Sequence, residues 1–364
     1  MSKLFTSLDT STLCFSNRVV MAPLTRSRSG PSRIPNELMA KYYGQRSQSG
    51  LIISEATVIS EQAIGWIDTP GIYTEEMTNG WKKITHEVHQ NNGQIFLQLW
   101  HCGRASHSDF HGGNKAVAPS PISIIGDQIH TPKGKKDHEV PRELKSDEIP
   151  LLVEDYRMAA IRAKEAGFDG IEVHSANGYL LDTFLQSKTN HRSDAYGGSV
   201  EKRCRLLSEV LDAVLTVWPA ENICVRLSPN GIFNDMGSDD YFKQFISVTK
   251  MIEKKSIGFL HVMDGLAFGF HEKGEAMVLE DFRSCFSGVL IGNCGYTKET
   301  AEKAVHEQKA DMIAFGRPYI SNPDLVQRMK KDLPLNPDAS MEDWYLSSKG
   351  EKGYTDFPTH DDSK

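Results

Sequence analysis

The sequence predicts an α/β protein with a single (β/α)8 TIM barrel, and two observations lead to this fold class. Short apolar runs alternate with segments of helical periodicity, and the alternation occurs eight times along the 364 residues. The apolar runs are nearly continuous, as expected for parallel strands that are buried on both faces. Repeated strand–helix alternation favours a closed barrel over a doubly wound sheet, and one barrel with insertions can use a chain of this length.

The elements can be placed in order from the pattern. The expected strands are Arg18–Met21, Leu51–Ser54, Gln94–Trp100, Gly170–His174, Ile223–Leu227, Phe259–Val262, Val289–Gly292 and Met312–Phe315. Before the fourth strand, Pro150 lies near the start of a helix and Gly167 ends it. The apolar face of that helix comprises Leu152, Tyr156, Ala159, Ala160 and Ala163. A second helical stripe runs from 207 to 218 with Ser199 as its expected N-cap, and a third helix covers 297–308.

Two regions depart from the alternation. Residues 106–146 follow the third strand and are rich in Gly, Pro, His and Ser. Because long loops with little structure are often functional, we expect this long loop insertion to form a lid or a small hairpin over the barrel mouth. Residues 348–364 form a polar tail in which Tyr354 and Phe357 are expected to pack back onto the body. Because no linker divides the chain, we expect residues 1–364 to form a single domain.

Composition narrows the class of protein. The chain has 41 Lys and Arg against 48 Asp and Glu, a formal net charge of −7, which argues against a nucleic-acid partner. No stretch resembles a signal peptide or the ~20 apolar residues of a membrane helix. The six cysteines are scattered without a C-x-x-C pair, which argues against a zinc ribbon or an iron–sulfur cluster. We therefore expect a cytoplasmic protein with reduced thiols and no membrane partner, either a monomer or a homodimer.

Polar side chains gather at the carboxyl ends of the expected strands, where active sites form in such barrels. The fourth strand delivers His174, Asn177 and Tyr179, a set that could grip an oxygen anion and deliver a proton. Small-residue loops after the last two strands are typical of a phosphate cradle, although glycine after a strand can also be an ordinary turn. The candidates for that cradle are Gly295, Gly316 and Arg317.

Several residues admit more than one role on residue type alone. A buried Arg226 should meet an anion or a carbonyl, but a salt bridge to Glu172 or Glu55 would also satisfy it. The role of Gln98 is similarly open. Glu55 and Glu172 could instead form the carboxylate pair of a glycosidase. Four aromatic side chains could border a flat apolar slot or belong to the core: Trp66, Trp100, Phe233 and Tyr354.

A structural role is the common one for a single histidine such as His174, but Asn177 and Tyr179 close behind it favour a site. His101, His107 and His174 suit a metal site by residue type only. Three or more converging ligands would be needed, so no metal is expected.

These residues belong to segments that resemble the old yellow enzyme family of FMN-dependent NADPH:ene-reductases. The family includes bacterial nitrate-ester and morphinone reductases and plant oxophytodienoate reductases. The segments are collinear, span nearly the whole chain and are specific in combination: Met21–Arg26, Gly50–Ala56, Gln98–His107, Phe168–Asp182, His191–Ser199, Val225–Pro229, Ala314–Arg317 and Ile320–Leu325. No Gly-x-Gly-x-x-Gly follows a strand, which disfavours a Rossmann-type dehydrogenase.

The resemblance implies a bound FMN. The residues implied to contact it are Ala22, Pro23, Leu24, Thr25, Ala56, Gln98, Arg226, Cys294, Gly295, Gly316 and Arg317. The Thr25 hydroxyl would bond the O4 edge of the flavin, Arg226 would lie by N1 and O2, and Arg317 would hold the phosphate.

The resemblance also implies an activity, the reduction of α,β-unsaturated carbonyl compounds by NADPH or NADH. Nitro compounds, nitrate esters and quinones are further substrates of such sites. His174 and Asn177 would bind the carbonyl oxygen, and Tyr179 would donate the proton. The residues implied to border the substrate are Trp66, Trp100 and Tyr354. A flavin-binding protein without catalysis is the remaining alternative, and it would not need these three polar residues together.

Three positions depart from the usual pattern of the family. Asn177 stands where many relatives have a second histidine, and both types donate hydrogen bonds. Trp66 replaces a tyrosine found in several relatives. Cys294 stands in the phosphate turn where a smaller residue is common, although its backbone N–H can still serve.

Overall fold

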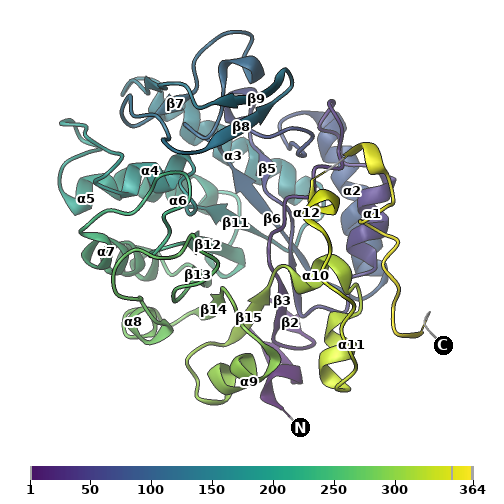
Figure 1. Ribbon diagram of the computed structural model, residues 1–364. Coiled ribbons are helices and arrows are strands. Elements are labelled where there is room, and N and C mark those ends of the chain that lie inside the picture. The colour runs from purple at the N-terminus through teal and green to yellow at the C-terminus, as the bar shows by residue number, and fades with distance from the viewer. Residues whose placement is uncertain (1, 346, 362–364) are drawn as a thin grey trace.

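The computed structural model describes residues 2–345 and 347–361 and shows a closed parallel barrel (Figure 1). Each barrel strand pairs in parallel with its neighbours, and pairing between the fourth and third strands closes the ring. The strands are β3 (Val19–Met21), β4 (Leu51–Ile53), β6 (Ile95–Trp100), β11 (Gly170–His174), β12 (Ile223–Leu227), β13 (Phe259–Met263), β14 (Val289–Asn293) and β15 (Met312–Phe315). The predicted TIM barrel is confirmed, and no strand boundary differs from its prediction by more than one residue.

Helices cover the outside of the barrel (Figure 1). The longer ones are α1 (Glu37–Gly44), α2 (Glu75–Gln90), α3 (Ile149–Glu165), α6 (Arg205–Leu215), α7 (Tyr241–Lys254) and α9 (Lys298–His306). The shorter ones are α4 (Leu180–Leu185), α5 (Val200–Arg203), α8 (Leu279–Arg283), α10 (Pro318–Ser321), α11 (Leu325–Lys330) and α12 (Met341–Trp344). The face predicted for α3 is buried as expected. Ser199 caps α5 through its side chain, but the helix expected to follow it is divided at Cys204 into α5 and α6.

Side chains that point into the barrel change from apolar to polar towards the carboxyl ends of the strands. Because residues two apart leave the same face of a strand, an apolar residue near the start of several strands is followed by a polar one nearer the carboxyl end. Phe96 is followed by Gln98 on β6, Phe259 by His261 on β13, and Ile291 by Asn293 on β14. The polar end of the barrel interior is therefore the end at which the site was predicted.

A hairpin that was not predicted closes the opposite end. It consists of β1 (Leu8–Asp9) and β2 (Cys14–Phe15), which pair antiparallel. Phe15 is fully buried, and its ring centroid lies 5.9 Å from that of Phe259 inside the barrel. The hairpin thus supplies the apolar base of the barrel interior.

The long insertion after β6 contains a hairpin of its own, β8 (Gln128–Thr131) with β9 (Gly134–Asp137). A parallel pair, β7 (Val117–Ala118) and β10 (Arg142–Glu143), ties the two ends of the insertion together. Asp109 binds Lys136 at 2.6 Å and accepts from the Thr131 hydroxyl at 2.8 Å, which fixes the hairpin. Residues 124–127 share a hollow of about 580 Å³ with Phe233.

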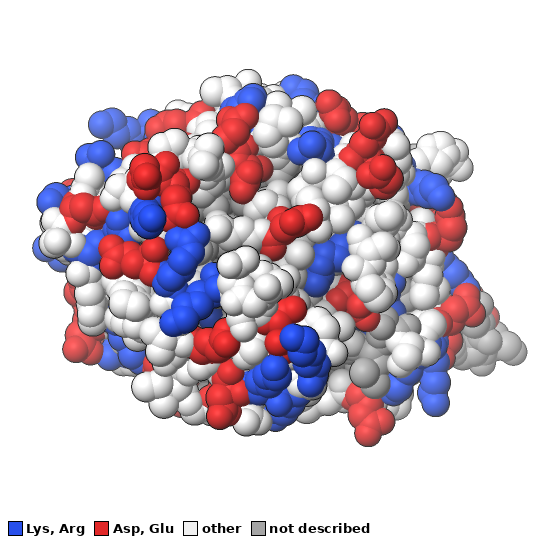
Figure 2. Space-filling view, turned by 90° about the horizontal axis from the view of Figure 1, so that it is seen from above, with Lys and Arg blue, Asp and Glu red and all other residues white. Residues whose placement is uncertain are grey.

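The tail packs back onto the body through Tyr354, which is fully buried. The short strand β5 (Thr57–Val58) adds to β6 beside the barrel. On the face seen from above, acidic and basic side chains are interspersed (Figure 2). Within the described residues, no helix is long and apolar enough to cross a membrane.

Candidate active site

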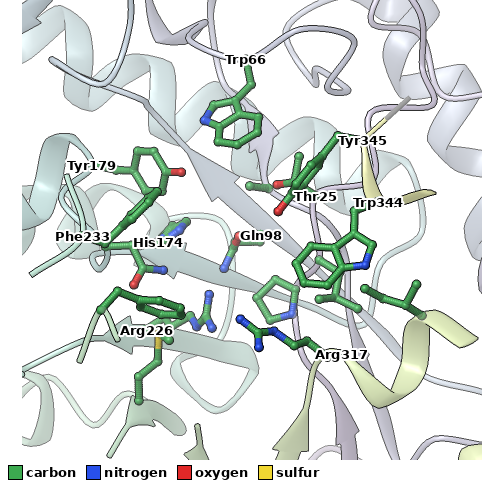
Figure 3. A pocket seen from close by; sticks show the side chains of 17 residues that line it. Thr25, Trp66, Gln98, His174, Tyr179, Arg226, Phe233, Arg317, Trp344 and Tyr345 are labelled. Carbon is green, nitrogen blue, oxygen red and sulfur yellow. The ribbon is translucent and has the colours of Figure 1, made fainter. Parts of the chain in front are cut away.

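A cavity of about 280 Å³ opens at the carboxyl end of the barrel (Figure 3). The carboxyl ends of the barrel strands and the loops after them supply most of its lining, and α10 and the end of α12 supply the rest. His174 and Tyr179 face Tyr345 and Trp344 across it, and Gln98 lies between them (Figure 3). The lining residues are Pro23, Leu24, Thr25, Ala56, Trp66, Gln98, His174, Asn177, Tyr179, Arg226, Phe233, Met263, Phe270, Arg317, Ile320, Trp344 and Tyr345.

A second hollow of about 390 Å³ continues from the first. The two form one elongated space, because their linings share Pro23, Leu24, Arg226, Met263, Phe270 and Arg317. The second hollow is also lined by the last residues of β14 and β15 and by the small-residue loops after them, namely Asn293, Cys294, Gly295, Tyr296, Phe315 and Gly316.

His174 is held neutral in the cavity. The side chain is 3% exposed, and its Nδ1 has no hydrogen-bond partner within the described part of the chain. Burial, together with the charge of Arg226, lowers the pKa of His174 to about 3. At neutral pH the imidazole therefore carries one N–H and can donate one hydrogen bond into the site.

Asn177 lies in a left-handed turn at φ 57°. Asparagine tolerates this conformation better than most residues, because its short side chain bonds locally. The turn is fixed by the Ser228 hydroxyl, which accepts from the Asn177 N–H at 2.8 Å, and by Asn234, whose side chain donates to the Asn177 carbonyl at 2.8 Å. The amide side chain of Asn177 thus reaches the cavity beside His174 from a rigid backbone.

Tyr179 packs edge-on against two rings. Its ring centroid lies 5.0 Å from that of His174 and 4.9 Å from that of Trp100. Burial raises the pKa of Tyr179 above its ordinary value, so the phenol stays protonated and is available as a proton donor. The three residues predicted as the substrate's half of the site lie together on one side of the cavity.

Arg226 and Gln98 supply the polar groups at the inner end. Arg226 donates to the Asn293 side chain at 3.0 Å, and its Nε has no partner within the described residues. Gln98 donates to Glu172 at 2.7 Å. Among the described residues no salt bridge joins Arg226 to Glu172 or Glu55; the guanidinium binds Asn293 instead, and its Nε stays available to a ligand.

The loops after β14 and β15 leave backbone accessible. Gly295 has φ 78°, and a Cβ built on it would meet nothing nearer than Ala267 at 3.5 Å. Arg317 lies over the ring of Phe268 at 4.2 Å and that of Trp344 at 5.4 Å. Burial raises the pKa of the Cys294 thiol to about 11, so this side chain is neutral beside the cradle.

Two predicted border residues lie elsewhere. Tyr354 is not at the cavity but in the core, where it stacks on Tyr42 with ring centroids 4.1 Å apart. Trp100 is fully buried behind Tyr179 and supports that ring rather than lining the cavity. Trp344 and Tyr345 occupy the position expected of Tyr354. A pair of adjacent aromatics in a polar segment was the available signal for them.

The carboxylate pair considered for a glycosidase does not reach the cavity. Glu55 and Glu172 are both fully buried and absent from its lining. Glu55 accepts from the Tyr43 hydroxyl and the Arg26 backbone, and burial raises its pKa to about 7. Neither carboxylate can contact a substrate, so this alternative is rejected.

The residues present fit a flavin mononucleotide. Pro23 and Leu24 offer a flat apolar surface, and the Arg226 Nε is a buried donor in need of an acceptor. The cradle at Gly295, with Arg317 beside it, suits a phosphate. The apolar surface and the donor line both hollows, and the cradle lines the second.

Comparisons with known proteins identify the family to which the chain belongs. The profile of the NADH:flavin oxidoreductase / NADH oxidase family matches residues 3–336. The "Probable flavin mononucleotide-dependent alkene reductase" of Leishmania infantum is 40% identical over 349 residues, covering 94% of this chain and 93% of its own.

Two solved structures share the whole fold. The old yellow enzyme homologue from Zymomonas mobilis is 42% identical with a TM-score of 0.94, covering 98% of this chain and 99% of its own. Morphinone reductase in complex with tetrahydroNAD is 41% identical with a TM-score of 0.92, covering 99% and 98%. The chain therefore belongs to the NADH:flavin oxidoreductase / NADH oxidase family, and within it to the FMN-dependent old yellow enzymes.

Proposed function

We propose that the protein is an ene-reductase that takes electrons from NADPH or NADH and reduces the activated C=C bond of α,β-unsaturated carbonyl compounds. FMN, when bound, would supply the hydride-transfer chemistry that links the nicotinamide to the second substrate. The observation that carries the proposal is that His174, Asn177 and Tyr179 face a cavity continuous with the cradle at Gly295. The alkene reductase and the tetrahydroNAD complex among the relatives support the two substrate classes.

His174 and Asn177 bind the carbonyl oxygen of the substrate in this proposal. Because His174 is neutral, it donates a hydrogen bond without adding a charge. Both donors gain strength as negative charge grows on that oxygen during reduction, and losing one such donor typically costs about 3 kcal/mol. Their fixed position in a buried site means that little reorganisation is needed during the reaction.

Tyr179 delivers the proton to the α-carbon. Its raised pKa makes it a weak acid, but the α-carbon of the enolate formed by hydride addition is strongly basic. Trp100 behind the ring holds the hydroxyl in place. Nitro compounds, nitrate esters and quinones present similar oxygen atoms to His174 and Asn177, and we include them in the proposed range.

The first test is a titration of FMN-loaded protein with a small phenol. A phenolate held by His174 and Asn177 should give a long-wavelength absorption band, and His174→Ala should weaken phenol binding at least tenfold. His86→Ala, which changes an exposed histidine outside the cavity, is the control. Unchanged phenol affinity in His174→Ala would contradict the oxygen-binding role, and a protein that cannot be loaded with FMN would contradict the function.

The second test separates the two half-reactions of Tyr179→Phe by stopped-flow. Reduction by NADPH should be spared, whereas reoxidation by an enone such as cyclohexenone should slow by a factor of about a hundred or more, the lower end of what general acid catalysis contributes. Tyr345→Phe removes another phenol from the same cavity and should slow reoxidation much less. Equal losses in both half-reactions of Tyr179→Phe would contradict the role of proton donor.

A further inference from the structure

A fully buried carboxylate, Glu172, lies directly beneath the cavity. Glu172 and His174 leave the same face of β11, and a rise of 3.3 Å per residue places Glu172 about 7 Å deeper in the barrel. In the sheet register, Glu172 is opposite Gln98 on β6 and Cys224 on β12. It is close enough to act on the cavity through its neighbours but too deep to touch a ligand.

Both oxygens of Glu172 are hydrogen-bonded. Gln98 Nε2 donates to Oε1 at 2.7 Å, His261 Nδ1 lies 2.8 Å from Oε2, and the Cys224 thiol donates to Oε2 at 3.3 Å. Burial by itself raises the pKa of Glu172, but the hydrogen bonds from His261 and Gln98 and the charge of Arg226 outweigh it and lower the pKa below its ordinary value. Glu172 is therefore a carboxylate at neutral pH, and a carboxylate only accepts hydrogen bonds.

This charge fixes the direction of the Gln98 amide. A glutamine side chain has a donor end and an acceptor end, and only the donor end can face a carboxylate. The nitrogen of Gln98 is thus turned down towards Glu172, and its oxygen is turned into the cavity that Gln98 lines. The site presents an acceptor there, which suits a ring N–H of the cofactor.

The same charge also offsets that of Arg226. Arg226 is buried, carries a full positive charge at any accessible pH, and interacts favourably with Glu172. An arginine alone at this depth would strongly favour any added negative charge on a bound ring. With Glu172 ionised nearby, that preference is reduced.

We propose that Glu172 is a positioning residue of the cofactor site: it orients Gln98 as an acceptor and offsets Arg226, so that the bound flavin remains a strong hydride donor. The inference rests on the proposed function, because it concerns the flavin that this function requires. It assigns a role to a carboxylate that touches neither cofactor nor substrate.

The test compares midpoint potentials of the FMN-loaded wild type, Glu172→Gln and Glu172→Asp, measured against a reference dye. Glu172→Gln removes the charge, so the reduced flavin should become at least tenfold more favoured, about 30 mV for a two-electron couple. Reduction by NADPH should then be as fast or faster, while reoxidation by an enone slows. Asp324→Asn, which neutralises another buried carboxylate that lines neither hollow, is the control and should leave the potential unchanged.

Glu172→Asp keeps the charge but withdraws the oxygen from Gln98. The equilibrium constant for flavin reduction, taken from the midpoint potential, should stay within threefold of the wild-type value. FMN affinity, measured by flavin fluorescence on titration of apoprotein, should fall at least fivefold. If Glu172→Gln cannot be recovered folded, this variant decides between the outcomes.

A parallel loss of both half-reactions at unchanged potential in Glu172→Gln would overturn the proposal, since it would show a structural role only. An equal shift of potential in Glu172→Asp would also overturn it, because the charge is retained there. A wild-type protein that does not bind FMN would instead refute the proposed function.

Discussion

Replacing Arg26 should loosen one side of the cavity, although Arg26 itself does not line the cavity. Arg26 is fully buried and donates to the carbonyls of Trp344 at 3.1 Å, Asp343 at 3.2 Å and Gly353 at 2.7 Å, and to the Tyr42 hydroxyl at 3.0 Å. Hydrogen bonds to a charged group contribute about 1.5–3 kcal/mol each, but neighbouring bonds are not additive. We expect Arg26→Met, which keeps most of the volume, to lower the free energy of unfolding by about 4 kcal/mol.

The assay is urea denaturation together with steady-state kinetics on an enone. Since Trp344 and Tyr345 line the cavity, their loss of support should raise KM for the enone more than it lowers kcat. Arg157→Met, which breaks a solvent-exposed pair with Glu154 on α3, is the control and should change stability far less. If Arg26→Met is as stable as that control and has the same KM as the wild type, the C-terminal segment does not depend on Arg26 and the reasoning is refuted.

Two further predictions concern a buried acid and a glycine. The pKa of Glu55 rises from 4.5 to about 7 in the folded protein, so its contribution to stability is present below 4.5 and is lost as pH rises through 7. Glu55→Gln should therefore gain about 3 kcal/mol relative to wild type between pH 4.5 and pH 8, as measured by urea midpoints; a difference independent of pH would contradict it. Gly295→Ala should weaken FMN binding more than tenfold at a stability cost of about 1–2 kcal/mol. Gly265→Ala, at a similar φ of 74° with open space around it, should show the stability cost alone.

The strands were predictable because parallel strands buried on both faces leave a local signal, an apolar run bounded by turns. His174 ends one such run, and Asn177 and Tyr179 follow within five residues, so their proximity was fixed by the chain itself. The β1–β2 hairpin left no comparable signal, since it is short and Phe15 is buried only because the barrel surrounds it.

The error at Tyr354 has a different cause. A buried aromatic and a cavity-lining aromatic are alike in sequence, and which one reaches the cavity depends on the path of the C-terminal segment. Arg26 and Arg28 set that path by binding the carbonyl of Asp343 from more than 300 residues away. Contacts of this kind between distant backbone and side-chain atoms have no local pattern from which they could be predicted.

The position of Arg26 in the chain links the two sides of the site. Residues Pro23, Leu24 and Thr25 line the cavity at the end of β3, and the next side chain holds Trp344 from beneath. Glu55 accepts from the Arg26 backbone N–H at 3.2 Å, which fixes the backbone between the cavity-lining residues and the Arg26 side chain. A change in the path of residues 23–26 would therefore move the proposed flavin surface and the aromatic side opposite His174 together. Because both sides depend on one short segment, substitutions at Arg26 should change the range of substrates accepted and the geometry of the cofactor site together. A variant that altered one without the other would show that the C-terminal segment is held independently.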